Sequence, residues 1–187
     1  MLNINRFISQ NITNRQESMF GTDIAVHKAE LTAAIAGKNV LVIGGAGTIG
    51  SSFIRAVLPF RPAQLVVVDL SENGLTELTR DLRSTYGMFV PEDYRTYPLS
   101  FADPIFEAIF RVNGGFDIVA NFSAHKHVRS EKDCFSVRAL LENNVLKARK
   151  LMDLLAQNPP EHFFCVSTDK AANPVNIMGA SKRIMED

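Results

Sequence analysis

The chain has 187 residues, enough for one domain with a substantial core but few for two domains of ordinary size. Hydrophobic residues make up 46% and charged residues 21%, as in soluble globular proteins, and lysine plus arginine balances aspartate plus glutamate at 20 each. This balance gives no reason to expect a nucleic acid or an anionic membrane surface as a partner. No apolar run approaches the ~20 residues of a membrane helix, and the N-terminus lacks the apolar centre of a secretory signal.

The predicted elements alternate between strands and helices. Residues 1–22 are polar, show no clear periodicity and are expected to form an N-terminal arm, whereas residues 23–187 are expected to form one domain. Apolar runs in the domain predict strands at 39–43, 64–69, 94–99, 117–122 and 162–167. Helical spacing and breaker residues predict helices at 24–35, 51–58, 73–86, 103–110 and 137–157. Because the strands are apolar nearly throughout, the pattern indicates an α/β fold, a Rossmann-like doubly wound parallel sheet covered on both faces.

Only two cysteines are present, Cys134 and Cys165, which argues against a disulfide framework and favours a reducing, cytoplasmic setting. Both thiols are expected to lie in the interior as small apolar side chains.

Three glycines follow the first predicted strand and open the next helix. Gly44, Gly47 and Gly50 are spaced three residues apart, and Thr48 and Ile49 lie between the last two. Glycine lets the backbone approach a pyrophosphate closely, and the helix N-terminus offers unpaired N–H groups and a partial positive charge. These five residues are therefore predicted to bind the phosphates of a dinucleotide; the alternative is a plain strand-to-helix turn.

Asp69 ends the second predicted strand, about 20 residues beyond the glycines, where a carboxylate can accept both hydroxyls of an adenosine ribose. The same carboxylate would repel a 2′-phosphate. The predicted cofactor is therefore NAD, with NADP as the alternative.

Reactive side chains also follow the last predicted strand. Thr168, Asp169 and Lys170 bring a hydroxyl, a carboxylate and an ammonium to three consecutive positions. Open α/β folds bind ligands at the carboxyl ends of their strands, so this stretch is a candidate catalytic site. Taken alone, it would be better explained as a helix-capping turn with a surface charge pair.

Four segments together resemble the extended short-chain dehydrogenase/reductase family, and within it the UDP-N-acetylglucosamine 4,6-dehydratases of polysaccharide biosynthesis. The resemblance extends from about residue 23 to the last residue, and its last segment is the most specific. The segments are I-G-G-A-G-T-I-G at 43–50, N-F-S-A-H-K-H-V at 121–128, N-N-V at 143–145 and S-T-D-K-A-A-N-P-V-N-I-M-G-A-S-K-R at 167–183.

The resemblance implies a lyase that acts on a UDP-N-acetylhexosamine: the sugar is oxidised at carbon 4, water is lost across carbons 5 and 6, and the hydride returns to carbon 6. In this scheme Thr168 hydrogen-bonds the 4-hydroxyl, Asp169 protonates the leaving hydroxyl and Lys170 removes the carbon-5 proton. Lys182 matches the lysine of the superfamily's Y-x-x-x-K motif and would hold the nicotinamide ribose. The implied cofactor contacts after the fourth strand are Phe122, Ser123 and Ala124, and the implied substrate contacts are Lys126, His127 and Asn173.

Met178 is the main departure from that pattern, because the superfamily usually has a catalytic tyrosine there and a thioether cannot exchange a proton. Some members of the dehydratase group also carry methionine, so the departure favours dehydration over epimerisation. A second departure is Leu99-Ser100, where members often have Gly-Asp near the adenine.

Two alternative functions remain open: an inverting dehydratase/5-epimerase or nucleotide-sugar epimerase, and an NAD-binding module without catalysis. A metal site is not expected, because no cluster of ligands completes the pair His125 and His127. The oligomeric state stays open, with a homo-oligomer among the options. Members of the resembled family continue into a C-terminal substrate lobe, so the domain is expected to be incomplete, to bind NAD weakly and to lack dehydratase activity alone.

Overall fold

The computed structural model of the protein describes residues 4–15, 18–126 and 133–187. The chain divides into two compact units, Met1–Ala34 and Ile35–Asp187, and each is described by itself. The first unit contains the helices α1 (Ile4–Asn11) and α2 (Gly21–Val26) and most of α3 (Lys28–Ile35).

The helix predicted over residues 24–35 is divided at His27. His27 is the C-cap residue of α2, and its N–H donates to the Asp23 carbonyl at 3.0 Å. The next helix, α3, begins one residue later. The helix α1 lies within the predicted arm, where the sequence showed no clear periodicity. The boundary predicted after residue 22 stays a prediction.

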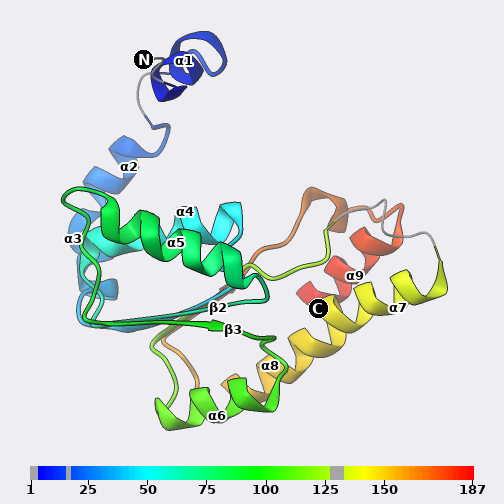
Figure 1. Ribbon diagram of the computed structural model, residues 1–187. Helices are drawn as coiled ribbons and strands as arrows, with labels where there is room; N and C mark the ends of the chain where they lie inside the picture. Colours follow the sequence, from blue (N-terminus) through cyan, green and yellow to red (C-terminus); the bar gives the residue numbers. More distant parts are fainter. Residues whose placement is uncertain (1–3, 16–17, 127–132) are drawn as a thin grey trace. The chain divides into compact units, whose positions relative to one another are not determined.

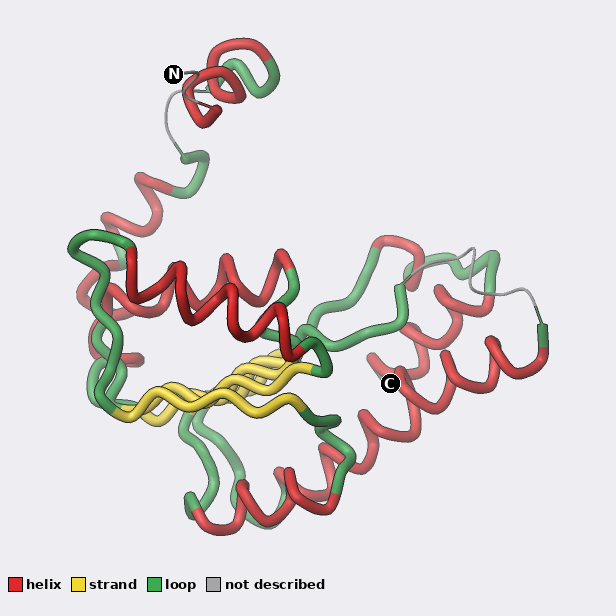
Figure 2. Tube along the Cα trace, in the orientation of Figure 1, coloured by secondary structure: helices red, strands yellow, loops and turns green. Residues whose placement is uncertain are grey.

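Five parallel strands form the sheet of the second unit, in the order β3-β2-β1-β4-β5. In Figures 1 and 2 the sheet is a single layer between two layers of helices. The predicted α/β class with a parallel, Rossmann-like sheet is therefore confirmed. The strands are β1 (Asn39–Ile43), β2 (Gln64–Asp69), β3 (Asp93–Pro98), β4 (Ile118–Asn121) and β5 (His162–Cys165).

Helices α4 (Thr48–Val57) and α5 (Glu72–Ser84) cover one face of the sheet, and α6 (Pro104–Val112) and α8 (Lys147–Leu155) cover the other (Figure 1). Alternate side chains of a strand enter the two cores, because successive Cβ atoms point to opposite faces. Val40 and Val42 thus pack with the α4–α5 layer, whereas Leu41 and Ile43 pack with the α6–α8 layer.

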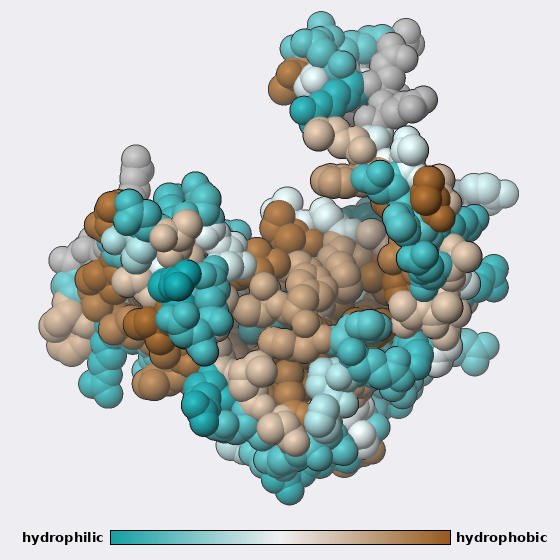
Figure 3. Space-filling view, turned by 180° about the vertical axis from the view of Figure 1, so that it is seen from behind, coloured by the Kyte–Doolittle hydropathy of each residue, from teal (hydrophilic) through white to brown (hydrophobic). Residues whose placement is uncertain are grey.

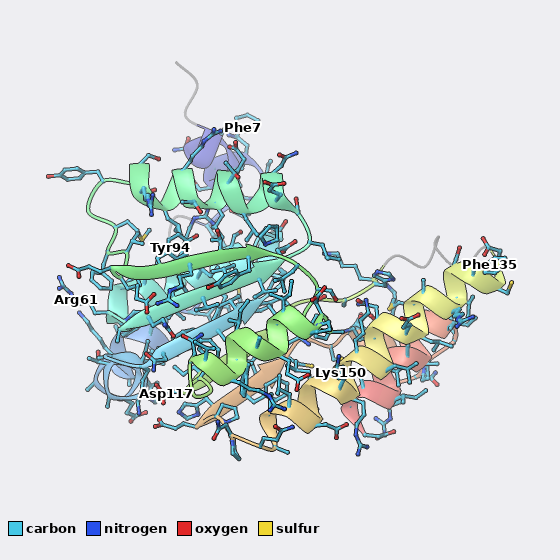
Figure 4. The ribbon with its side chains drawn as sticks, turned by 60° about the horizontal axis from the view of Figure 1, so that its bottom comes forward. Phe7, Arg61, Tyr94, Asp117, Phe135 and Lys150 are labelled. Atoms are coloured by element: carbon cyan, nitrogen blue, oxygen red, sulfur yellow. The ribbon has the colours of Figure 1, made fainter. Side chains whose placement is uncertain are left out.

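Side-chain caps start several of these helices where the sequence predicted them. The Ser71 hydroxyl accepts the Gly74 N–H at the start of α5, and the Asp103 carboxylate accepts the Ile105 N–H at the start of α6. Such caps satisfy N–H groups that have no partner within the helix. Between α6 and α8, the ammonium of Lys150 donates to the Ala102 carbonyl at 2.8 Å and ties α8 to the loop before α6 (Figure 4).

The long helix predicted over residues 137–157 is interrupted. It consists of α7 (Cys134–Leu141), a π-helical turn η3 (Glu142–Leu146) and α8. A π-helical turn accommodates one extra residue and often marks a functional site. Here it turns Asn143 and Asn144 into the interior, where both side chains are buried.

The last strand, β5, differs from the continuous buried strand predicted for it. It pairs with β4 on one side, and Phe164 is 38% exposed. Figure 3 shows apolar side chains gathered on the side of the molecule opposite to the view of Figure 1. Cys134 is also exposed rather than interior, because it begins α7 at the surface.

At the opposite end of the sheet from the predicted site, Asp117 lies just before β4 (Figure 4), and its carboxylate accepts the Asn39 N–H at 2.7 Å.

None of the helices in the described ranges is both long enough and apolar enough to cross a membrane.

Candidate active site

The carboxyl ends of the strands meet at one edge of the sheet, and the glycine turn lies there. Gly44 has a positive φ of 76°, and a Cβ at this position would lie 2.8 Å from the Ser123 nitrogen. A Cβ on Gly50 would collide with the Gly44 carbonyl. The turn therefore brings the backbone after β1 against the backbone after β4, and both contacts require glycine.

Helix α4 begins directly after this turn. Its N-cap residue is Gly47, which has no side chain to accept the first N–H groups, and Thr48 and Ile49 form the first turn of the helix. The first N–H groups of a helix lack partners within it and attract anions. The arrangement offers phosphate oxygens both a close backbone and uncapped N–H donors.

Asp69 lies at the end of β2, next to the glycine turn. One carboxylate oxygen accepts the Ala46 N–H at 3.0 Å and the other accepts the Ser71 N–H at 2.9 Å. These bonds fix the carboxylate between the glycine turn and the start of α5. Asp69 thus lines the same cavity as Gly44 and Gly47, as the sequence predicted.

This cavity, which we call the turn cavity, has a volume of about 240 Å³. Ser123 and Leu99-Ser100 also line it, so the Leu99-Ser100 departure from the resembled pattern lies beside Asp69. The predicted cofactor contacts in its lining are Gly44, Gly47, Asp69, Phe122, Ser123 and Ala124, and Lys126 is the predicted substrate contact there.

A second cavity of about 340 Å³, which we call the lysine cavity, adjoins the first. Phe122, Ala124 and Lys126 line both cavities, so the two lie side by side. The other residues of the lysine cavity are Ile49, Val166, Ser167, Thr168, Lys170, Met178 and Lys182.

The Thr168 hydroxyl donates to the Asp169 carboxylate at 2.9 Å, and its oxygen lies 3.4 Å from the Lys170 N–H. Thr168 thereby caps the 3₁₀ turn η4 (Asp169–Ala171). The capping turn, which was the alternative explanation of this stretch in the sequence, is therefore present. The same turn directs Thr168 and Lys170 into the lysine cavity, whereas Asp169 is exposed and does not line it.

Helix α9 (Ile177–Glu186) supplies the opposite wall of the lysine cavity. Its N-cap residue is Asn176, whose side chain accepts the Gly179 N–H at 2.8 Å. Met178 and Lys182 lie one helical turn apart and are 2% and 4% exposed. Positions four residues apart lie on one face of a helix, and both side chains line the same cavity.

The ammonium of Lys182 donates to the Val166 carbonyl at 2.9 Å. Burial lowers the pKa of Lys182 because desolvation disfavours its charged form, while the nearby Cys165 and Glu186 act in the opposite direction. Lys182 is thus held in place by the residue that follows β5, and it lines the cavity.

Asn144 connects three parts of this site. Its side-chain carbonyl accepts the His125 N–H at 2.8 Å, and its amide group donates to the His125 carbonyl at 2.9 Å and to the Ser181 hydroxyl at 3.0 Å. The Ser181 hydroxyl donates in turn to the Met178 carbonyl at 2.7 Å. Asn144 thus ties the backbone after β4 to α9.

Some predicted site residues lie outside both cavities. Thr48 and Gly50 shape the turn without lining it, and Asn173 is exposed in the loop before α9. His127 falls outside the described residues. Within the part of the chain that the structure describes, no three His, Cys, Asp or Glu side chains gather as a metal site would need.

The sequence interpretation missed two contributors to the site. Ser167 lines the lysine cavity, and its only signal was its place before Thr168. Gly179 lets α9 approach η4 closely, because a Cβ there would lie 2.5 Å from the Lys170 carbonyl. A glycine inside a helical pattern was the available signal for that approach.

A protein-family model described as "Polysaccharide biosynthesis protein" matches residues 40–187. The chain belongs to this polysaccharide biosynthesis protein family. The match covers every strand of the sheet and both cavities. Because it extends from β1 to the last residue, it includes the glycine turn and the segment from Ser167 to Lys182.

Relatives with curated names agree with this family. The capsular polysaccharide biosynthesis protein CapD of Staphylococcus aureus is 31% identical over 177 residues, which cover 91% of this chain and 28% of CapD. A UDP-N-acetylglucosamine 4,6-dehydratase (inverting) of Campylobacter jejuni is 26% identical over 147 residues, 78% of this chain and 41% of the enzyme. The chain thus spans less than half the length of these relatives.

The fold is also that of solved enzymes. The Bordetella bronchiseptica enzyme WbmG, solved in complex with NAD and UDP, superimposes with a TM-score of 0.63 at 19% identity, over 81% of this chain and 48% of that one. At this identity the likeness establishes the fold, and the family rests on the matches above.

Proposed function

We propose that these residues are the cofactor-binding and catalytic half of a UDP-N-acetylhexosamine 4,6-dehydratase of polysaccharide biosynthesis. The observation that carries the proposal is the lysine cavity, which gathers Thr168, Lys170, Met178 and Lys182 and lies beside the turn cavity. The 26% identity to a UDP-N-acetylglucosamine 4,6-dehydratase supports the same reaction class.

NAD fits the turn cavity on three grounds. Gly44 and Gly47 bring a backbone without side chains into the lining of the turn cavity, where a pyrophosphate could approach it closely. Helix α4 begins there with an uncapped N-terminus. The Asp69 carboxylate lies in the cavity lining, where it can accept ribose hydroxyls and repel a 2′-phosphate. When bound, the nicotinamide would supply a reversible acceptor for the hydride of carbon 4.

In the proposed reaction, Thr168, Asp169 and Lys170 carry all the proton transfers. The Thr168 hydroxyl accepts the 4-hydroxyl proton of the sugar and passes its own proton to Asp169, to which it is already hydrogen-bonded at 2.9 Å. Asp169 lies beside Thr168 but outside the lining of the lysine cavity, so this step requires its side chain to turn toward the substrate, where it gives a proton to the hydroxyl that leaves carbon 6. Lys170, as a neutral amine, takes the proton of carbon 5 and returns one there after hydride arrives at carbon 6. The net change is the loss of one water.

Met178 and Lys182 have supporting roles in this scheme. Met178 closes the cavity with an apolar side chain and exchanges no proton, so the route through Thr168 replaces the usual tyrosine. Lys182, fixed by the Val166 carbonyl, would hold the nicotinamide ribose when the cofactor is bound. Lys126 and the exposed Asn173 remain proposed substrate contacts, as does His127.

The test uses the longest natural polypeptide that carries this sequence, purified and incubated with NAD and UDP-N-acetylglucosamine. We expect a 4-keto-6-deoxy product in the NMR spectrum, and its configuration at carbon 5 separates retention from inversion. The variants Asp169→Asn and Lys170→Ala should each lower kcat at least 100-fold, because each removes an acid or a base. Full activity of both variants would leave only the alternative of an NAD-binding module whose catalysis lies elsewhere.

The same assay tests the epimerase alternative, which Met178 disfavours. An epimerase would yield a UDP-sugar that keeps its 6-hydroxyl and differs only at carbon 4. That product, in place of the 6-deoxy sugar, would overturn the dehydratase assignment. It would leave NAD binding and the family unaffected.

A further inference from the structure

One buried hydroxyl in the lysine cavity has no partner. The Ser167 oxygen is inaccessible to solvent and, among the described residues, makes no hydrogen bond. Nearly all buried polar groups in proteins are hydrogen-bonded, and an exception calls for an explanation, such as a bound molecule that completes the pairing. Ser167 lines the cavity between Val166 and Thr168, at the end of β5.

The neighbouring polar groups are already engaged. Thr168 donates its hydroxyl proton to Asp169, and the Lys182 ammonium donates to the Val166 carbonyl. Met178, across the cavity, carries no hydroxyl. Within the described part of the chain, the Ser167 hydroxyl in this cavity therefore neither donates nor accepts a hydrogen bond.

We propose that Ser167 is a further binding residue whose hydroxyl pairs with a sugar hydroxyl of a molecule bound in the lysine cavity. The inference rests on the proposed function, which places two such sugars there, the nicotinamide ribose of NAD and the hexosamine of the substrate. A serine side chain turns about a single bond between three staggered positions, so Oγ reaches the cavity without movement of the backbone. A sugar hydroxyl is both donor and acceptor and matches both free functions of Ser167.

A role in binding also accounts for a buried hydroxyl that the protein itself does not pair. A site built to hydrogen-bond a substrate hydroxyl rejects an analogue that lacks it, since the buried partner is then left alone. Ser167 therefore acts through binding selectivity, whereas Thr168 acts on the proton of the 4-hydroxyl.

The experiment compares Ser167→Ala with Ser167→Thr, which keeps a hydroxyl, and with Ser84→Ala, which removes an exposed hydroxyl at the end of α5, outside both cavities. The longest natural polypeptide is titrated with NAD alone, and then with UDP-N-acetylglucosamine and its 4-deoxy analogue in the presence of NAD. Thermal unfolding without ligand is followed for each protein.

We expect Ser167→Ala to raise the Kd of one ligand about 10-fold, because the variant loses one hydrogen bond to a buried hydroxyl. Weaker NAD binding identifies the ribose as the partner. If Ser167→Ala binds UDP-N-acetylglucosamine more weakly than the wild-type protein but binds the 4-deoxy analogue equally well, the partner is the sugar 4-hydroxyl. Ser167→Thr should restore most of the loss, Ser84→Ala should change nothing, and the unfolding temperature of Ser167→Ala should not fall.

Two outcomes would overturn the inference, and they are distinguishable. If the wild-type protein binds both ligands and Ser167→Ala binds them within twofold of it, Ser167 is a packing residue and the proposed function stands. If the wild-type protein binds neither NAD nor the UDP-sugar, the proposed function fails and this inference fails with it.

Discussion

The amide of Asn144 donates to the hydroxyl of Ser181 at 3.0 Å, across 37 residues of sequence. Both side chains are buried, Asn144 in the π-helical turn η3 and Ser181 in α9. The same amide group holds the backbone at His125, so one side chain sets the distance between the loop after β4 and the helix of Met178 and Lys182.

Replacement of Asn144 by alanine should destabilise the protein by about 2–4 kcal/mol, because it leaves the backbone N–H and carbonyl of His125 without these partners and removes the donor to the Ser181 hydroxyl. Ser181→Ala should cost less, about 1 kcal/mol. Urea unfolding of the two variants and the double variant measures their coupling. Strict additivity would show that the 3.0 Å contact contributes no free energy of its own.

Gly44 and Gly87 provide a matched pair, because both have a φ of 76°. An alanine at either position bears the strain of a positive φ, about 1 kcal/mol. Only at Gly44 would the new Cβ also meet the backbone of Phe122 and Ser123, since nothing lies within 4 Å at Gly87. Gly44→Ala should therefore abolish NAD binding in a fluorescence titration and lower stability more than Gly87→Ala, which should bind NAD normally. Equal losses in both variants would refute a role for the close approach.

Burial of Lys182 predicts a pH dependence of stability. Its pKa is lowered in the folded protein from the ordinary value of 10.5, so between the folded and unfolded values only the unfolded chain holds the proton. Stability rises with pH wherever the unfolded state binds more protons. The cost of burying the ammonium is therefore fully present below the folded pKa and disappears as the pH approaches 10.5.

Lys182→Met has no ammonium to bury, so it avoids this cost at every pH. Near neutral pH we therefore expect a higher free energy of unfolding for Lys182→Met than for the parent protein. This difference should shrink as the pH is raised. Both proteins should carry Cys165→Ala, because burial raises the pKa of the Cys165 thiol and its titration lowers stability over the same alkaline range. The measurement is urea unfolding at several pH values. An advantage that stays constant would show that Lys182 is not desolvated.

Local signals sufficed for much of the fold and part of the site. Apolar runs predicted the strands, and the spacing of Gly44, Gly47 and Asp69 predicted residues that do line one cavity. Lys182 was matched to the superfamily's Y-x-x-x-K motif, and α9 places it one turn from Met178, in the lining of the same cavity.

The features that the sequence did not disclose depend on segments far apart in the chain. The π-helical turn at Asn144 has no local signature, because its partners His125 and Ser181 are 19 and 37 residues away. The approach of Gly179 to Lys170 and the burial of the Ser167 oxygen likewise arise only when α9 packs against the turn after β5. The exposure of Phe164 follows from the position of β5 beside β4 alone, which periodicity cannot reveal.

The most direct test of the dehydratase assignment follows the hydrogen of carbon 4. UDP-N-acetylglucosamine deuterated at carbon 4 is incubated with NAD and the longest natural polypeptide in ordinary water, and the product is analysed by NMR. The account predicts a 4-keto-6-deoxy sugar that carries the deuterium at carbon 6. A product with deuterium returned to carbon 4 and the 6-hydroxyl intact would contradict it.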